Sequence, residues 1–129
     1  MTADQNKQVV RRFIQEVLAD GHLDRIHELL APDYVNRAFG ADLPAFKGML
    51  PGLVTALPVR RFDVEELIAE DDAVVARYTS EMRDASGTTI SVRGLTYYRL
   101  RDGRIVEDDP ITSPELTAAL GGLLAPASA

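Results

Sequence analysis

The stretch VRGLTYYRLRDGRIVEDDPI, residues 92–111, predicts two β-strands joined by a tight turn. The turn falls at Asp102-Gly103, because glycine adopts a positive φ without a Cβ clash and aspartate tolerates the left-handed region. Even-numbered positions from Val92 to Leu100 carry no charge, whereas the odd positions of the strand include Arg93, Arg99 and Arg101. Because side chains alternate between the two faces of a strand, the first strand has one dry face and one solvated face.

The second strand carries the first indication of chemistry. If this strand is regular, Ile105 shares its face with Glu107 and Asp109. Asp109 is therefore the expected carboxylate on the apolar side and Asp108 the outward one, and a bulge before Pro110 would exchange them. A carboxylate among apolar groups has a raised pKa, which suits proton transfer near neutral pH. The alternative is an ordinary solvated carboxylate at a strand end.

The remainder of the chain changes from a helical to a strand period after Pro58. Apolar residues at steps of three and four come first, and alternating segments follow. Pro51 is expected to kink or interrupt the third helix. The expected elements are helices over residues 4–18, 23–30 and 44–57, strands over 33–37, 59–70, 73–84, 88–101 and 104–111, and a short helix from Ser113. This order predicts one α+β domain over residues 1–129, a strongly curved, mostly antiparallel, cone-shaped sheet roofed by three N-terminal helices.

Composition excludes several classes of protein. The chain has 129 residues, 46% hydrophobic residues, no cysteine and a formal net charge of −6. The acidic balance argues against nucleic acid as a partner, and the lack of a long apolar run argues against a membrane span. Without cysteine there is no disulfide, thiolate metal site or cysteine nucleophile. We expect no metal and no cofactor, and a cytoplasmic location because no secretory signal is visible.

The dry faces of the strands and helices enclose an expected pocket for a small apolar ligand. Tyr78 and Tyr98 both fall on this inner side, where their hydroxyls orient a ligand oxygen or bond to the backbone. The expected pocket residues are Phe13, Val17, Phe46, Tyr78, Val92, Thr96 and Tyr98.

Four blocks of the chain carry a family resemblance. They are NKQVVRRFIQEVLADGHLDRIHELLAPDYVNR (residues 6–37), VEELIAEDDAVVARY (64–78), RGLTYYRLRDGRIVED (93–108) and LTAALG (116–121). Together they resemble the SnoaL-like polyketide cyclase branch of the nuclear transport factor two-like superfamily. This superfamily contains cyclases, isomerases, dehydratases, epoxide hydrolases and non-catalytic binding proteins.

The resemblance implies a cofactor-independent enzyme that cyclises or isomerises an apolar, polyketide-like carbonyl compound. Such cyclases use a carboxylate late in the last strand, and Asp109 is the expected candidate. In the family this strand usually continues with aromatic residues and a further aspartate near its end, whereas this chain has Asp109, Pro110, Ile111, Thr112 and Ser113 at those positions. The family also implies a homodimer that pairs through the outer sheet face.

Two other functions stay open. Limonene-epoxide hydrolases have a Tyr-x-Asn pair on the first strand that holds water beside an aspartate, and Tyr34 and Asn36 have that spacing. Those enzymes also use an arginine and an aspartate one residue apart on the penultimate strand, and Arg93-Gly94-Leu95 lacks the acid. The third candidate is a non-catalytic domain that binds a ligand or a partner.

Overall fold

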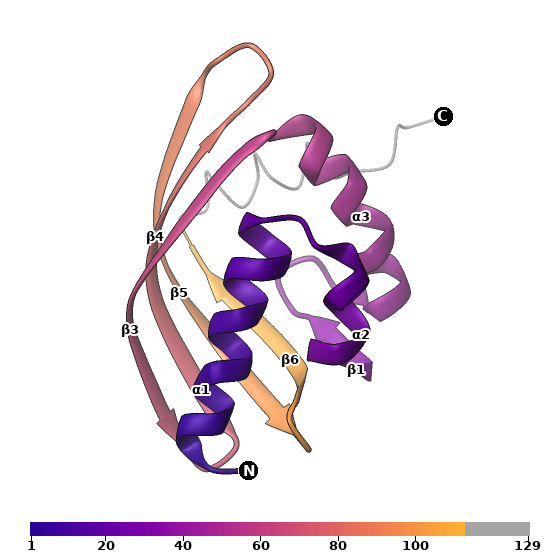
Figure 1. Ribbon diagram of the computed structural model, residues 1–129, viewed down its shortest axis with the longest axis vertical. Coiled ribbons are helices and arrows are strands. Elements are labelled where there is room, and N and C mark those ends of the chain that lie inside the picture. The colour runs from indigo at the N-terminus through magenta and orange to yellow at the C-terminus, as the bar shows by residue number, and fades with distance from the viewer. Residues whose placement is uncertain (113–129) are drawn as a thin grey trace.

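The computed structural model describes residues 1–112, and its helices lie together on one side of a bent sheet (Figure 1). The elements are α1 (Ala3–Arg12), the π-helix η1 (Phe13–Ala19), the 3-10 helix η2 (Leu23–Arg25), α2 (Ile26–Leu29), β1 (Leu30–Asn36), β2 (Ala41–Asp42), α3 (Leu43–Ala56), β3 (Val59–Glu70), β4 (Ala73–Arg83), β5 (Thr89–Arg101) and β6 (Arg104–Ile111). The helix predicted from Ser113 lies outside the described residues.

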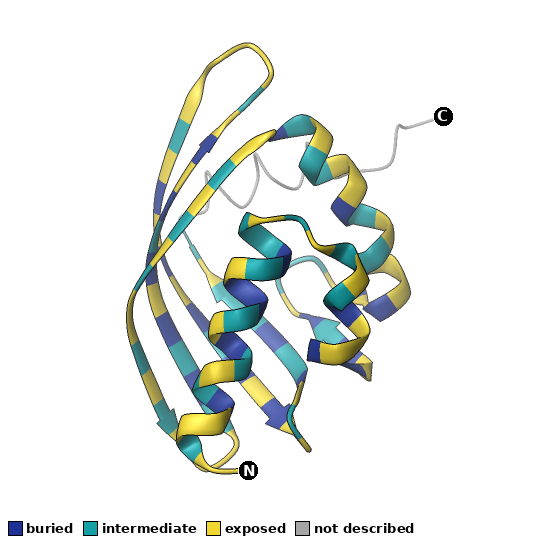
Figure 2. Ribbon diagram, in the orientation of Figure 1, coloured by how far each residue is buried: buried dark blue, intermediate teal, exposed yellow. Residues whose placement is uncertain are grey.

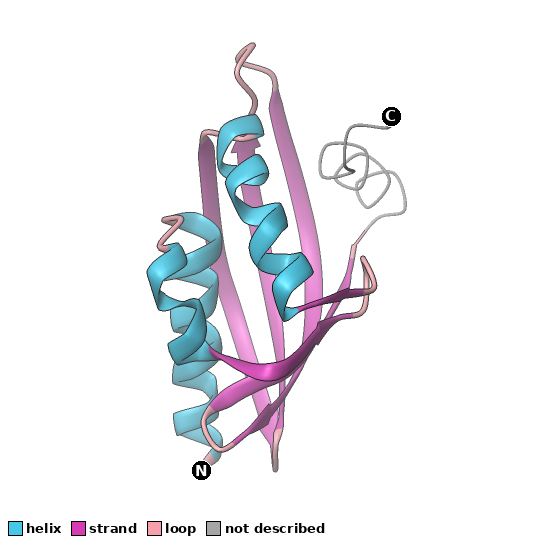
Figure 3. Cartoon of the chain, turned by 90° about the vertical axis from the view of Figure 1, so that its right-hand side faces the viewer, coloured by secondary structure: helices cyan, strands magenta, loops and turns pink. Residues whose placement is uncertain are grey.

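The six strands form one sheet in the order β2-β1-β6-β5-β4-β3. β1 and β6 are parallel, and every other neighbouring pair is antiparallel. Figure 3 shows β1 and β6 crossing the long strands β3 to β5, so that the sheet bends around the helices. The α+β prediction, with a curved, mostly antiparallel sheet and three N-terminal helical segments, is confirmed.

The β5–β6 hairpin has the predicted turn and the predicted alternation. Asp102 and Gly103 both have positive φ, 51° and 80°, as a two-residue hairpin turn requires. The even positions of β5 from Val92 to Leu100 are buried, and its arginines are exposed. β5 therefore forms part of the inner wall with one face and part of the outer surface with the other.

The predicted faces of β6 are wrong, because the strand contains a β-bulge. Arg99 of β5 pairs with Glu107, but the next residue, Leu100, pairs with Ile105, which leaves Val106 as an extra residue. One extra residue moves every following side chain of the strand to the opposite face of the sheet. Asp108 is consequently buried, at 5% exposure, whereas Asp109 is partly exposed.

The helical segments follow local sequence signals with two corrections. α1 begins with a capping box between Thr2 and Gln5, and Asp42 caps α3. α3 continues through Pro51, which was expected to kink or interrupt it. The second helical segment ends at Leu29 rather than residue 30, because Leu30 already pairs with Ile105 of β6.

The core lies between the helices and the concave face of the sheet (Figure 2). Phe13 is at its centre, with its ring centroid 6.1 Å from that of Phe46 and 6.2 Å from that of Tyr98. The π-helical turns of η1 place Phe13, Ile14 and Val17 in this core. No helix in the described part of the chain has the length and apolarity to span a membrane.

Candidate active site

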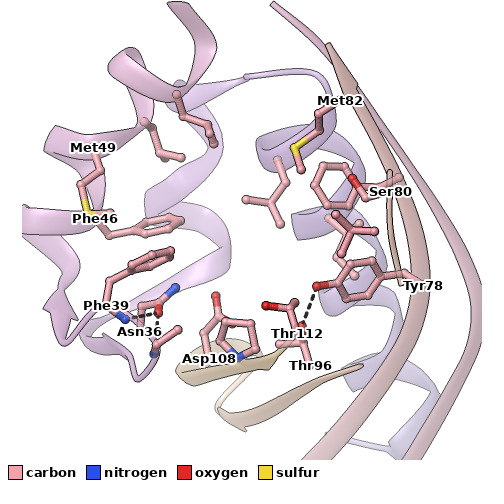
Figure 4. A pocket seen from close by; sticks show the side chains of 18 of the residues that line it. Asn36, Phe39, Phe46, Met49, Tyr78, Ser80, Met82, Thr96, Asp108 and Thr112 are labelled. Carbon is pink, nitrogen blue, oxygen red and sulfur yellow. Dashed lines mark hydrogen bonds between the residues drawn. The ribbon is translucent and has the colours of Figure 1, made fainter. Parts of the chain in front are cut away.

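A cavity of about 130 Å³ opens between the helices and the sheet (Figure 4). By the same kind of measure, an engineered cavity of about 150 Å³ binds benzene, so the space holds about one ring, and because the cavity is partly open a longer ligand can continue out of it. The lining is mostly aliphatic and aromatic, with a few polar side chains. The lining residues are Ile14, Leu18, Asn36, Ala38, Phe39, Phe46, Met49, Leu50, Leu53, Phe62, Tyr78, Ser80, Met82, Val92, Thr96, Tyr98, Asp108, Pro110 and Thr112.

Asp108 is the carboxylate of this cavity. Its Oδ2 accepts a 2.7 Å hydrogen bond from the hydroxyl of Tyr34, which is fully buried. Burial raises the pKa of Asp108 to about 7, the Tyr34 hydrogen bond lowers it, and the charge of Asp109 raises it. Asp108 therefore exchanges a proton near neutral pH, as a general acid or base must.

Tyr34 binds Asp108 from a position in the core, outside the cavity lining. Its ring lies 5.2 Å from that of Phe46, between centroids. Burial and the neighbouring Asp108 carboxylate hold the pKa of the Tyr34 hydroxyl well above its usual value. The phenol stays protonated and remains a hydrogen-bond donor to the carboxylate.

Asn36 presents an amide donor beside this pair. Its Oδ1 accepts hydrogen bonds from the backbone N–H groups of Ala38 and Phe39, at 3.0 and 3.2 Å. Because those bonds fix the oxygen, the amide nitrogen is directed toward the cavity (Figure 4). A hydrogen bond from Asn36 also lowers the pKa of Tyr34 against the effect of burial. Asn36, Tyr34 and Asp108 therefore form one connected polar group.

The opposite wall carries a second, weaker polar group on β4 and β5. Thr96 Oγ1 donates to the Tyr78 hydroxyl at 3.5 Å. Burial raises the pKa of Tyr78, and burial raises the pKa of Tyr98 more strongly. Both tyrosines are hydrogen-bonding phenols rather than acids at neutral pH.

Most of the predicted pocket residues line the cavity. These are Phe46, Tyr78, Val92, Thr96 and Tyr98, and Asn36, which was expected as a catalytic residue, lines the cavity as well. Phe13 and Val17 are buried in the core, and their neighbours Ile14 and Leu18 line the cavity instead. The π-helical turn explains this difference, because its side chains do not follow the 3.6-residue period used for the prediction.

The expected place of Asp109 needs correction. Asp109 pairs with Tyr97 on β5, while its neighbour Asp108 pairs with Tyr98 and lines the cavity. The sequence contained one signal for this exchange, the three consecutive acidic residues 107–109, which supply a carboxylate to either face. The bulge that decides between them involves Val106, which has no distinctive bulge residue type such as glycine.

The sequence prediction also missed Ser80 and Phe62. Both lie on the inner face, where Phe62 of β3 pairs with Ser80 of β4. The alternation of β4 already predicts Ser80 on the same uncharged face as Tyr78, but the expected pocket residues did not include it. Among the described residues, no group of three or more histidine, cysteine or acidic side chains is arranged to hold a metal ion.

The chain belongs to the SnoaL-like domain family, whose model matches residues 10–108. Solved structures share the fold. A candidate polyketide cyclase from Acidithiobacillus ferrooxidans is 22% identical with a TM-score of 0.76, over 97% of this chain and 100% of that one. IdmH, a candidate polyketide cyclase from Streptomyces antibioticus, is 23% identical with a TM-score of 0.74, over 92% and 99%. TerC, crystallised with polyporic acid, is 22% identical with a TM-score of 0.72, over 95% and 99%. No curated protein matches the chain.

Proposed function

We propose that this protein is a cofactor-independent enzyme that cyclises or isomerises a small apolar carbonyl compound, with Asp108 as its acid and base. The observation that carries the proposal is the buried Asp108 carboxylate in an apolar cavity, with a pKa of about 7 and a fixed Tyr34 donor. The candidate polyketide cyclases among the structural relatives support the carbonyl chemistry.

The proposed reaction uses residues on both sides of the cavity. Ionised Asp108 removes the proton next to a substrate carbonyl, and the enolate oxygen accepts hydrogen bonds from the Asn36 amide. The enolate carbon then attacks a second carbonyl carbon of the same molecule, forming a C–C bond. Protonated Asp108 returns its proton to the new alkoxide. The product is an isomer of the substrate, and no electron is lost or gained.

Proton exchange provides a test that does not need the natural substrate. We expect the protein to accelerate exchange of the α-protons of 4-phenylcyclohexanone in D2O, followed by NMR, with a rate that rises through a midpoint near pH 7. Asp108→Asn should reduce the rate by about 10²-fold or more, because the base is gone. Asp109→Asn is the matched control and should stay within a few fold. Equal rates for the wild type and Asp108→Asn would contradict the proposal.

A second candidate is the addition of water to an epoxide. The connected side chains of Tyr34, Asn36 and Asp108 favour it, because a carboxylate and an amide together orient and activate a water molecule. The epoxide oxygen would then need a proton donor, and Arg93-Gly94-Leu95 offers no acid. The phenols that line the cavity, Tyr78 and Tyr98, both have raised pKa values, which makes them weak acids. Conversion of cyclohexene oxide to the diol, lost in Asn36→Ala, would favour this reaction. The third candidate, a non-catalytic binding domain, predicts neither activity.

We also propose that two copies associate through the outer face of the sheet. Leu95 is 45% exposed there, between Arg93 and Arg99 on β5. An aliphatic side chain flanked by arginines suits an interface that pairs with the acidic residues of the partner. Light scattering should give the mass of a dimer for the wild type and of a monomer for Leu95→Asp.

A further inference from the structure

Ser80 has a buried hydroxyl that the fold does not use. The residue lies on β4 and is 5% exposed, and its Oγ has no hydrogen-bond partner among the residues that the structure describes. Figure 4 shows its side chain pointing from the strand toward the cavity, which it lines. Buried polar groups are nearly always paired, so an exception inside a cavity indicates a ligand contact.

The surroundings of Ser80 are apolar. Its lateral neighbours in the sheet are Phe62 on β3 and Val92 on β5. Along β4, Met82 shares its face on one side and Tyr78 on the other. A valine or alanine would fill this position without burying an unpaired hydroxyl, so packing alone does not account for a serine.

Ser80 and Asp108 lie far apart in the sheet. Ser80 pairs with Val92 on β5, whereas Asp108 pairs with Tyr98 on the same strand. The distance from Val92 to Tyr98 is roughly 20 Å along an extended strand, and the curvature of the sheet shortens the direct path. The two polar groups thus lie toward opposite ends of the cavity, with Tyr78 and Thr96 between them.

We propose that Ser80 is a specificity-determining residue that binds an oxygen at the far end of an extended, largely apolar ligand. This inference rests on the proposed function, which places the reacting carbonyl of the same ligand at Asp108. A serine hydroxyl both donates and accepts, so a terminal hydroxyl or carbonyl satisfies it. The substrate class is therefore an elongated carbonyl compound with a second oxygen function remote from the reacting carbon.

Two matched probes test this assignment by calorimetry or NMR titration. 4-(4-Hydroxyphenyl)cyclohexanone has an oxygen at each end, and 4-phenylcyclohexanone lacks the distal hydroxyl. We expect the wild type to bind the hydroxylated probe about fivefold to tenfold more tightly, as one buried hydrogen bond allows. Ser80→Ala should abolish this preference and leave the affinity for 4-phenylcyclohexanone within twofold. Ser80→Cys, which keeps the size but bonds weakly, should lose most of the preference.

Equal affinities of the wild type for the two probes would overturn the assignment, as would an equal effect of Ser80→Ala on both. If neither probe binds, the proposal of an extended ligand is overturned. A lower Tm of Ser80→Ala without probe would show that the fold uses the hydroxyl, and would also overturn it. Repeating the titrations with Asp108→Asn separates the two proposals. A hydroxyl preference retained there supports Ser80 even if the proton-exchange test of Asp108 fails.

Discussion

The hydroxyl of Tyr34 on β1 donates a 2.7 Å hydrogen bond to Asp108 on β6, across 74 positions of the sequence. The parallel pairing of β1 with β6 brings the two residues together, since Asn36 pairs with Asp108 directly. Because both side chains are buried, the bond lies in an apolar environment where electrostatic effects are strong.

Asp108→Asn should make the protein more stable at alkaline pH. The pKa of Asp108 is about 7 in the folded protein, against 3.8 for an ordinary aspartate side chain. Between these values the folded state binds more protons than the unfolded state, so the free energy of unfolding falls as pH rises from about 4 to 7. Asparagine cannot ionise and still accepts the Tyr34 bond. Urea denaturation should show a gain on the order of 3 to 4 kcal/mol at pH 8 and almost none at pH 4.

The matched control for this experiment is Asp109→Asn, a partly exposed carboxylate on the neighbouring residue. Removing its charge should lower the pKa of Asp108 and give only a small stability change at pH 8. A pH profile of wild-type stability that is flat from 4 to 8 would show that Asp108 titrates normally.

Tyr34→Phe should raise the pKa of Asp108 further. The hydroxyl lowers that pKa because it donates to the ionised carboxylate, and phenylalanine fills the same space without a donor. The pH midpoint of Asp108, measured by ¹³C NMR of its carboxyl carbon, should move upward. Tyr97→Phe on the outer face, where the hydroxyl accepts from Arg99, should leave the midpoint in place. An unchanged midpoint in Tyr34→Phe would show that the bond does not act on the carboxylate.

Gly94→Ala should disturb the cavity through Tyr78. A Cβ at Gly94 would lie 2.7 Å from both Cζ and the hydroxyl oxygen of Tyr78, which is closer than real contacts allow. The tyrosine must move, at a cost of about 1 to 3 kcal/mol of unfolding free energy, and its hydroxyl leaves the cavity wall. Gly52→Ala is the control, because a Cβ there meets no atom within 4 Å and the site is inside α3. Thermal unfolding should show a loss for Gly94→Ala and a small gain for Gly52→Ala.

Arg60 should contribute more to stability than its neighbour Arg61. Its guanidinium donates to the carbonyl oxygens of Leu18 and Ala19 at 2.9 and 3.1 Å, and to that of Leu57 at 2.6 Å. These bonds join the end of η1 to the end of α3. Arg60→Met leaves three carbonyls unpaired and should cost about 2 to 4 kcal/mol in a denaturant titration.

Arg61→Met provides the comparison within the same strand. Arg61 forms an exposed ion pair with Asp63 at 3.3 Å, and exposed pairs contribute less than about 1 kcal/mol. Similar losses of unfolding free energy in the two variants would show that the bonds of Arg60 between η1 and α3 add no stability.

The sequence predicted the fold because its signals repeat over many residues. Alternation along residues 92–100 and the Asp102-Gly103 turn set the hairpin, and the structure confirms both. Tyr34 and Asn36 were expected on one face of a short strand, and both are buried on it.

The site was less predictable because it depends on single-residue irregularities. Val106 forms a bulge without a characteristic residue type, and it exchanges Asp109 for Asp108 in the cavity. The π-helix η1 similarly changes which residues of the first helical segment line the cavity. Neither feature follows the period of a regular α-helix or β-strand, so periodicity in the sequence does not predict it.

The bulge beside residues 107–109 has a consequence for how this scaffold can evolve. Three consecutive carboxylates occupy the strand, and the local register decides which of them enters the cavity. A single insertion or deletion in β6 would replace Asp108 in the cavity by Glu107 or Asp109, without any substitution among these three residues. A change of backbone register alone can therefore decide whether an aspartate or the longer glutamate enters the cavity, while the outer face keeps its negative charges.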